Sequence, residues 1–274
     1  MSGLLRSLPV LLRLDGRVAW RGRLVHVVVL AGTFFGLLAR FVLPASAGGG
    51  LPWDADALAP GLDEAVHHTV TMLHAPRAPV PFHGRFVPLL LGLDVVLLGL
   101  LFGGVLVLQE KAEGTVRAYR VTPGGPGPYL ASKVLVCAGL SVLNTLLLVG
   151  IAAPQGLASP GLWFLVLGVA LTFSLVGIGL APFFTNLSSF FYPLALIGFA
   201  LSLPMMAYSS PSLGLDGLRV IPTYEVMFVG LELLFPSGVG VDWALTGSIV
   251  VGPLLAAACL AFLTIDRRLL REAT

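Results

Sequence analysis

The sequence has few charged side chains. Asp, Glu, Lys and Arg make up 11% of its 274 residues, against roughly 25% in soluble domains, whereas hydrophobic residues make up 57%. So little polar surface argues against a soluble enzyme and against a disordered regulator. The net charge of +2 is too small to indicate a nucleic-acid partner. These absences predict a membrane protein.

Cysteine and lysine are nearly absent, with two residues of each. Cys137 and Cys259 lie in apolar runs, so we predict two buried thiols and no disulfide framework. Neither Lys111 nor Lys133 follows a glycine, as the lysine of the nucleotide-binding motif GxxxxGK[ST] does. No GxSxG or HExxH motif is present either, so we predict no catalytic residue, metal ligand or cofactor in this chain.

Long hydrophobic runs are abundant. A helix needs about 20 mostly apolar residues to cross the bilayer, because each residue adds about 1.5 Å and no backbone group stays unpaired in lipid. Six stretches meet this requirement: residues 24–43, 87–108, 134–153, 162–181, 190–208 and 244–264. The sequence therefore predicts an all-α integral membrane protein, with residues 1–274 forming a single transmembrane domain.

The basic residues fall mainly on one side of this six-span arrangement. Twelve of the 16 precede the first span, lie between the second and third, or follow the last: Arg6, Arg13, Arg17, Arg21, Arg23, Lys111, Arg117, Arg120, Lys133, Arg267, Arg268 and Arg271. Cytoplasmic loops carry such an excess of Lys and Arg. We therefore predict a protein of the cell (inner) membrane with both termini in the cytoplasm, as an even number of spans requires.

The N-terminal segment admits several interpretations. Leucines at helical spacing in residues 2–22 favour an amphipathic helix on the cytoplasmic leaflet, and a plain positively charged anchor is the alternative. A signal peptide cleaved near Ala45-Ser46-Ala47 is a third interpretation. Its hydrophobic run would exceed the usual length, and cleavage would leave five spans.

Two loops are predicted outside the cell. In residues 44–86, a short helix over 62–73 would pair Asp63 with His67 and Glu64 with His68, and this is the one place suited to a His and carboxylate metal site. Solvated polar side chains explain the pattern more simply.

The second outside loop, residues 209–243, is unusually apolar. Residues 223–235 are too few to span the bilayer, so they predict re-entrant or interfacial outer helices before the last span. Glu225 and Glu232, seven residues apart, would share a face directed at water or a cavity.

Polar residues within the spans are candidates for a substrate pathway. Asp94 lies about 10 Å inside the second span, where a carboxylate is costly unless it is paired, protonated or hydrated. Arg40 is the expected partner, either in a structural pair or beside an outward-open cavity that attracts a cationic substrate. Asn144, in the third span, is expected to hydrogen-bond a neighbouring helix or a second copy of the chain.

The loop of residues 109–133 reads QEKAEGTVRAYRVTPGGPGPYLASK. Its first half predicts a short charged helix in which Glu113 and Arg117 form an i, i+4 pair, and the prolines and glycines of residues 123–128 end that helix. Such a loop suits the transmission of force from a cytoplasmic partner. A loop that only fixes the topology is the alternative.

This loop resembles the corresponding motif of the ABC type-2 permeases, the membrane halves of ATP-binding-cassette exporters. The matching positions are Glu110, Glu113, Gly114, Thr115, Arg117, Thr122, Pro123, Tyr129 and Lys133. The predicted N-terminal helix, the six spans and the short helices before the last span are also similar to that family. Ile221-Pro222-Thr223 gives a weaker likeness to members described as drug exporters.

The resemblance implies a cytoplasmic coupling helix that contacts an ATPase. It assigns coupling to Glu110, Glu113, Gly114, Thr115, Arg117 and Arg120. It further implies a separate ABC ATPase subunit holding ATP and Mg, and a second permease half, identical in a homodimer or a related permease. The loop of residues 182–189 has no charge, so a second docking contact there is not expected.

Two functions remain open at this point. The first is the permease subunit of an ABC exporter that moves a hydrophobic or amphiphilic substrate, such as a drug, lipid or peptide. The second is an ion- or proton-coupled secondary transporter that uses Asp94 and requires no ATPase.

Overall fold

The structure is a computed structural model that describes residues 2–42, 82–120, 126–209, 216–236 and 240–271. The described residues form helices and short connections, without a strand. The α-helices are α1 (Ser2–Arg21), α2 (Leu24–Leu37), α3 (Phe82–Glu113), α4 (Thr115–Arg120), α5 (Pro126–Ala152), α6 (Pro160–Leu180), α7 (Leu187–Ser209), α8 (Pro222–Leu234) and α9 (Trp243–Thr264). The π-helices are η1 (Leu38–Val42) and η7 (Ile265–Arg271), and the 3-10 helices are η3 (Pro154–Ala158), η4 (Ala181–Phe183) and η6 (Asp216–Val220).

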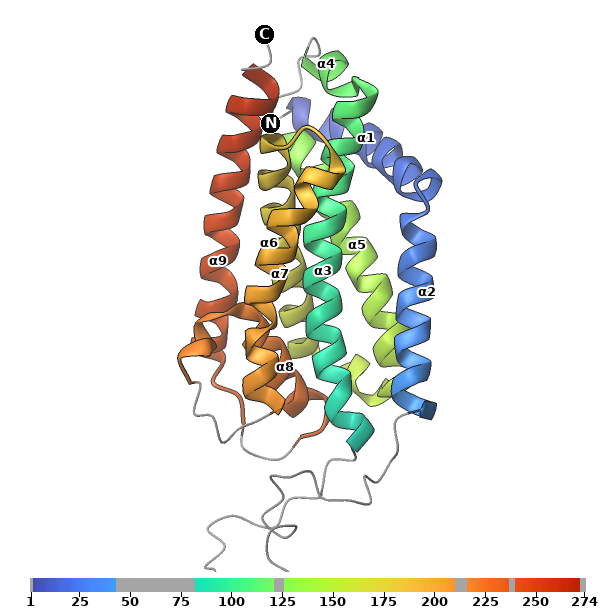
Figure 1. The fold of residues 1–274 in the computed structure, drawn as a ribbon, viewed down its shortest axis with the longest axis vertical. Coiled ribbons are helices and arrows are strands. Elements are labelled where there is room, and N and C mark those ends of the chain that lie inside the picture. The colour runs from blue at the N-terminus through green and yellow to red at the C-terminus, as the bar shows by residue number, and fades with distance from the viewer. Residues whose placement is uncertain (1, 43–81, 121–125, 210–215, 237–239, 272–274) are drawn as a thin grey trace, which may run out of the picture.

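The six predicted spans are confirmed as six helices long and apolar enough to cross a membrane. They are α2 with η1, α3, α5, α6 with η4, α7, and α9 with the start of η7, and they run along the long axis of the molecule (Figure 1). The helices on either side of the charged loop extend well beyond their hydrophobic stretches: α3 continues to Glu113 and α5 begins at Pro126. Charged residues can continue a helix beyond the bilayer, so hydropathy marks the membrane segment rather than the helix ends.

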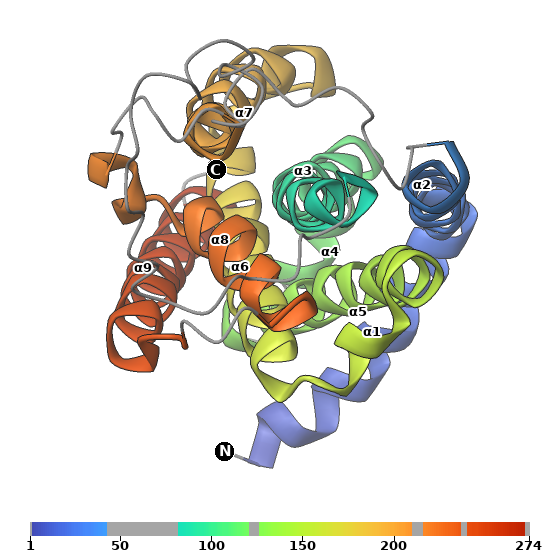
Figure 2. The same ribbon diagram turned by 90° about the horizontal axis from the view of Figure 1, so that it is seen from below.

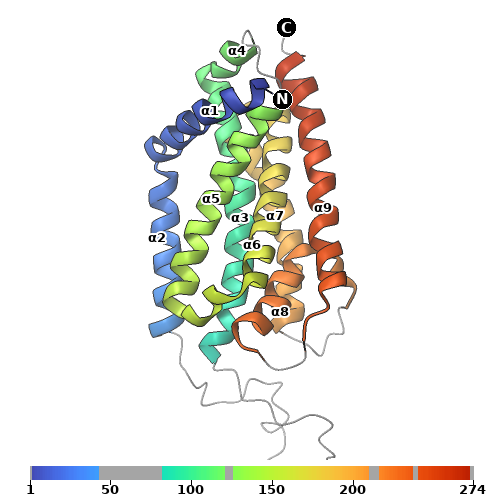
Figure 3. The ribbon, with the colours of Figure 1, turned by 180° about the vertical axis from the view of Figure 1, so that it is seen from behind.

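The N-terminal segment forms one helix that lies across the end of the bundle (Figure 3). Arg23 has a left-handed φ of 60° and follows Gly22, whose N–H donates to the carbonyl of Val18 at 2.7 Å. This turn redirects the chain from α1 into α2. The predicted helix is therefore present, and its place on the cytoplasmic leaflet stays a prediction.

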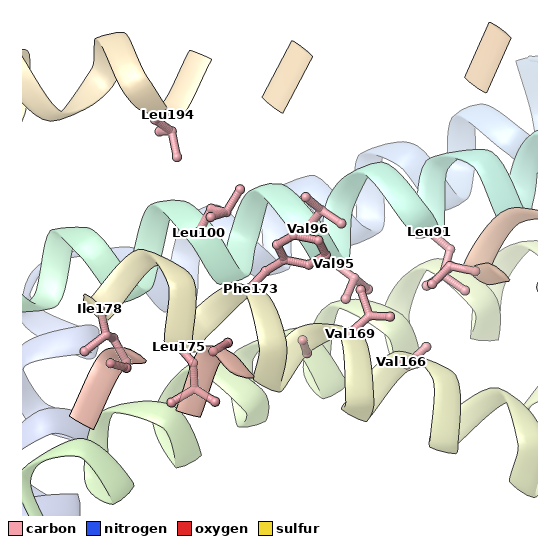
Figure 4. Close-up of a cluster of buried hydrophobic side chains, with 14 of the residues drawn as sticks. Leu91, Val95, Val96, Leu100, Val166, Val169, Phe173, Leu175, Ile178 and Leu194 are labelled. Carbon is pink, nitrogen blue, oxygen red and sulfur yellow. The ribbon is translucent and has the colours of Figure 1, made fainter. Parts of the chain in front are cut away.

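Helices α3 and α6 form the centre of the bundle, with α2, α7 and α9 at the periphery (Figure 2). Glycines let the two central helices approach closely: a Cβ on Gly103 would collide with the carbonyl of Ser174, and one on Gly177 with that of Leu100. Beside them, a buried apolar cluster includes Val95 and Leu100 from α3 and Phe173 from α6 (Figure 4).

The two ends of the molecule carry different elements. Both ends of the chain lie at the end that carries α4, and α8 lies near the opposite end, against α3 and α6 (Figures 1 and 3). At 13 residues, α8 is only about 20 Å long, too short to cross a bilayer. The helix predicted before the last span is thus present, and its re-entrant position stays a prediction.

The prediction of two buried thiols is confirmed for Cys137 and wrong for Cys259. Cys137 is buried on α5, but Cys259 is exposed. It lies on the outward side of α9, a peripheral helix whose hydrophobic residues face away from the bundle as well as toward it.

Candidate functional site

The predicted coupling loop is built on a break between two helices. Helix α3 ends at Glu113, Gly114 has a φ of 73°, and α4 begins at Thr115. The Thr115 hydroxyl donates to the carbonyl of Glu110 at 3.1 Å, which ties the start of α4 to the last turn of α3. A left-handed φ suits glycine because a Cβ is strained there. The predicted short helix of this loop therefore corresponds to α4, and its coupling role stays a prediction.

The single helix predicted across Glu113 and Arg117 is interrupted. The break at Gly114 places the two residues in different helices, so they do not have helical i, i+4 spacing. The Glu113 carboxylate accepts a hydrogen bond from Nε2 of Gln109 at 3.1 Å, and its pairing with Arg117 stays a prediction. Glu113 is exposed, and the side chains of Arg117 and Arg120 lie outside the described part.

A buried ion cluster lies beneath this loop. Nζ of Lys133, at the start of α5, is 2.6 Å from Oε1 of Glu110 on α3 and 3.0 Å from Oδ1 of Asp15 on α1. All three residues are at most 8% exposed. Three helices from distant parts of the sequence therefore meet at one ammonium group.

The remaining carboxylate oxygens of the cluster also have donors. The Tyr129 hydroxyl donates to Oε2 of Glu110 at 2.7 Å, and the Ser132 hydroxyl donates to Oδ2 of Asp15 at 2.6 Å. Nζ of Lys133 also lies 4.4 Å from the centre of the Tyr129 ring. Buried charges are tolerated when their hydrogen-bonding capacity is filled in this way. The cluster fixes α1 to the ends of α3 and α5 that lie nearest α4.

The cluster also influences α4. The ring of Tyr119 on α4 lies 5.3 Å from that of Tyr129, centre to centre. Burial and the nearby negative charge of Glu110 raise the pKa of the Tyr119 hydroxyl above its usual value. Tyr119 is therefore neutral at physiological pH and can pack against the cluster without adding a charge.

The uncharged turn between α6 and α7 is contacted by cationic side chains from other helices. Nζ of Lys111, on the last turns of α3, donates to the carbonyls of Pro182 at 3.1 Å and Phe184 at 2.6 Å. The guanidinium of Arg268, in η7, lies 4.5 Å from the centre of the Phe183 ring. The coupling end of α3 is thus joined to the α6–α7 turn as well.

The predicted pair between Asp94 and Arg40 is wrong. Nη1 of Arg40 donates to the carbonyl of Ile151 at 2.8 Å, whereas Oδ2 of Asp94 accepts from Nδ2 of Asn144 at 3.3 Å. Arg40 is exposed at the end of the first span, where a backbone carbonyl at the end of α5 is within its reach. Asn144 thus joins α5 to α3, confirming its predicted contact with a neighbouring helix.

This intramembrane polar site is only partly satisfied. Oδ1 of Asn144 and the hydroxyl of Ser141 are buried and have no hydrogen-bond partner among the described residues. Asp94 is 8% exposed, and its one described hydrogen bond is to the neutral Asn144 amide. The carboxylate therefore has no basic counterpart within the described ranges.

The two acidic residues of α8 do not form a common water-facing surface. Glu225 is fully buried and accepts a 2.7 Å hydrogen bond from the Thr246 hydroxyl on α9. Glu232 is only partly exposed. The prediction that both face water or a cavity is wrong for Glu225, because α8 folds against the start of α9, which supplies a hydroxyl donor.

The proposed metal-binding loop cannot be compared with the structure. The candidate helix of residues 62–73 lies outside the described residues. Among the residues that are described, no group of three His, Cys, Asp or Glu side chains is placed to hold a metal ion.

The sequence motif of the loop named two members of the ion cluster, Glu110 and Lys133, but the sequence analysis did not name the third, Asp15. Asp15 is the only acidic residue before Asp54, in a segment otherwise rich in arginine. A single carboxylate among several arginines was the signal in the sequence that could have marked Asp15 as a candidate for an ion pair.

Comparison with known families identifies the chain. The model of the family described as "Fluoroquinolones export permease protein Rv2686c-like" matches residues 78–224, just over half of the sequence. The chain belongs to this family. It is an ABC type-2 permease family, which confirms the resemblance based on the loop. No curated protein and no solved structure gave a match.

The matched range has a clear relation to the site. It contains α3, α4, α5, α6 and α7, and with them Glu110, Tyr129 and Lys133. The matched range does not contain α1, so Asp15, the third member of the ion cluster, lies outside it. The export permease is thus a multi-pass membrane protein with a transport role.

Proposed function

We propose that this permease is the membrane half of an ATP-driven exporter of amphiphilic drugs of the fluoroquinolone kind. Membership of the export-permease family carries this proposal, and the loop around α4 supports its mechanical part. The sequence lacks GxxxxGK[ST], so ATP and Mg would be held by a separate ABC ATPase. A second permease half, identical or related, would complete the transporter.

The coupling step would be a displacement of α4 by the ATPase. Movement of α4 would reach α3 directly, through the Gly114 junction and the hydrogen bond from Thr115 to Glu110. It would reach α5 and α1 through Lys133, which contacts Glu110 and Asp15. Force applied outside the membrane would then reach two spans and the N-terminal helix together.

A crosslinking and transport experiment tests the partner and the coupling. A photo-crosslinking residue at Glu113 should capture an ABC ATPase, whereas one at Pro236, exposed at the opposite end, should not. In vesicles with that ATPase, Glu113→Ala should lower fluoroquinolone transport about tenfold while ATP turnover persists, a coupling loss of about 1.4 kcal/mol. Arg13→Ala, an exposed change on α1, is the control and should transport normally.

The alternative is a secondary transporter that uses Asp94. The observation in its favour is that this carboxylate has no basic partner among the described residues. The two functions differ in their energy source. Vesicles without ATPase should not transport under a proton gradient if the exporter proposal holds. Full-rate transport under that condition would replace it with the alternative.

Asp94 has a place in the exporter proposal as well. A carboxylate without a basic neighbour attracts the positive group of a cationic or zwitterionic substrate. Asp94→Asn keeps the side-chain shape, so it should lower export of cationic substrates and leave neutral ones unchanged. Equal transport of both kinds by this variant would assign Asp94 a structural role only.

A further inference from the structure

A shallow groove lies at the α4 end of the bundle, away from the ion cluster. It has a volume of about 270 Å³ and is lined by Phe183, Leu260, Leu263, Thr264, Arg267 and Arg268. Phe183 belongs to η4 and the other residues to α9 and η7. The groove combines an apolar wall with two arginines, and the proposed coupling mechanism does not use it.

The two arginines are available for an anion. Both are exposed, and neither forms an ion pair in the part of the chain that the structure describes. Arg268 is held in place by the Phe183 ring, 4.5 Å from its guanidinium, which leaves the edge of the guanidinium for other contacts. Such edges present N–H donors that match phosphate oxygens.

The groove lies at the level expected of lipid headgroups. Trp243 begins α9 and is 46% exposed, as is typical of an aromatic residue at a membrane interface. Arg267 is 24 residues further on, about 36 Å at 1.5 Å per residue, against a hydrocarbon core of about 30 Å. With Trp243 at one interface, Arg267 and Arg268 therefore reach the other.

The apolar wall points into the bilayer. Leu260 is 62% exposed and Leu263 is 42% exposed, and both lie on α9 before the arginines. Their surface is within a membrane-spanning helix, so a soluble protein cannot reach it, but an acyl chain can. A ligand that contacts both parts must be apolar at one end and anionic at the other.

We propose that this groove binds an anionic phospholipid of the leaflet that borders α4. Its phosphate lies between Arg267 and Arg268, and an acyl chain follows Leu260 and Leu263. Basic pockets between membrane helices recognise anionic headgroups in this way. Lys111 holds the same η4 turn, so the lipid lies next to a contact of the coupling end of α3.

Native mass spectrometry of the intact, detergent-purified permease tests this site with phosphatidylglycerol and phosphatidylcholine as probes. Wild type should retain phosphatidylglycerol preferentially, and the double variant Arg267→Gln/Arg268→Gln should weaken that retention at least tenfold. Arg13→Gln/Arg17→Gln removes the same charge from exposed positions of α1 and is the matched control, expected to bind as wild type. Thermal melting of each variant establishes that it is folded.

Two further arms separate the lipid from other ligands. Inorganic phosphate at millimolar concentration should not displace phosphatidylglycerol, because the acyl chain contributes to binding; displacement would overturn the lipid assignment. A photo-crosslinker at Thr264, which lines the groove and leaves both arginines in place, should label lipid, and capture of the ATPase instead would contradict the proposal. Equal losses in the two double variants would also overturn it, since they would indicate diffuse surface charge rather than a site.

Discussion

At the scale of single residues, Lys133 joins three helices through one side chain. Its ammonium serves two buried carboxylates, Glu110 and Asp15, at 2.6 and 3.0 Å. Lys133→Met would leave both carboxylates without a cation, a change that costs about 3–5 kcal/mol in buried pairs. We expect a lower melting temperature of the purified permease, measured in detergent by thermal unfolding.

Two comparison variants isolate the effect of charge. Lys111→Met removes a lysine that bonds only to carbonyls, so it should cost less stability than Lys133→Met. The triple variant Asp15→Asn/Glu110→Gln/Lys133→Met leaves no charge in the cluster and should recover most of the loss. A Lys133→Met protein as stable as wild type would show that the cluster does not hold the helices together.

Only some of the contacts between these residues could be predicted from the sequence. The loop motif identified Glu110 and Lys133, because both are close in sequence to a recognisable pattern. Asp15 lies 95 residues before Glu110 and looks like a polar-face residue of an amphipathic helix. The Asp94–Arg40 pair failed for a related reason: sequence gives depth in the membrane but not the rotation of each helix, which decides whether Asn144 or Arg40 faces Asp94.

At the scale of elements, Gly114 sets the angle between α3 and α4. Its φ of 73° is unfavourable for alanine by roughly 1–2 kcal/mol, and alanine favours continuation of α3 through this position. Gly114→Ala should therefore redirect α4 and uncouple ATP turnover from transport, measured as the ratio of transport to hydrolysis in vesicles with the ATPase. The bundle should stay folded, because a Cβ on Gly114 meets no atom within 4 Å.

Gly139→Ala is the matched control for this prediction. Gly139 lies within α5, and a Cβ there also has open space. Alanine should be neutral or slightly stabilising at that helical position and should leave coupling intact. If both variants transport normally, the break at Gly114 is not needed for coupling.

The elements themselves were largely predictable. Six hydrophobic stretches gave six helices in the right places, because lipid requires each stretch to satisfy its own backbone. What the pattern did not give was the break at Gly114 or the extension of α3 to Glu113. These features lie beyond the apolar stretch, where local backbone preference and tertiary contacts decide the conformation.

At the scale of the whole molecule, one end of the bundle gathers the features that the mechanism needs. Helix α4 and both chain ends share that end, and α8 lies near the other (Figures 1 and 3). The ion cluster, on the last turns of α3 and the start of α5, and the groove beside Phe183 belong to the same end. Twelve of the 16 basic residues also belong to it by sequence. From the positive-inside tendency we predict that this end lies in the cytoplasm, within reach of an ATPase.

Cysteine labelling in intact cells tests that orientation. In a Cys259→Ser background that retains the buried Cys137, a membrane-impermeant maleimide should modify Pro236→Cys but neither Arg17→Cys nor Glu113→Cys, all three positions being exposed. After permeabilisation all three should react, which controls for accessibility. Labelling of Glu113→Cys from outside would put α4 beyond the reach of any cytoplasmic ATPase. Coupling through Glu110 and Lys133 would then be impossible, however well the ion cluster stabilises the fold.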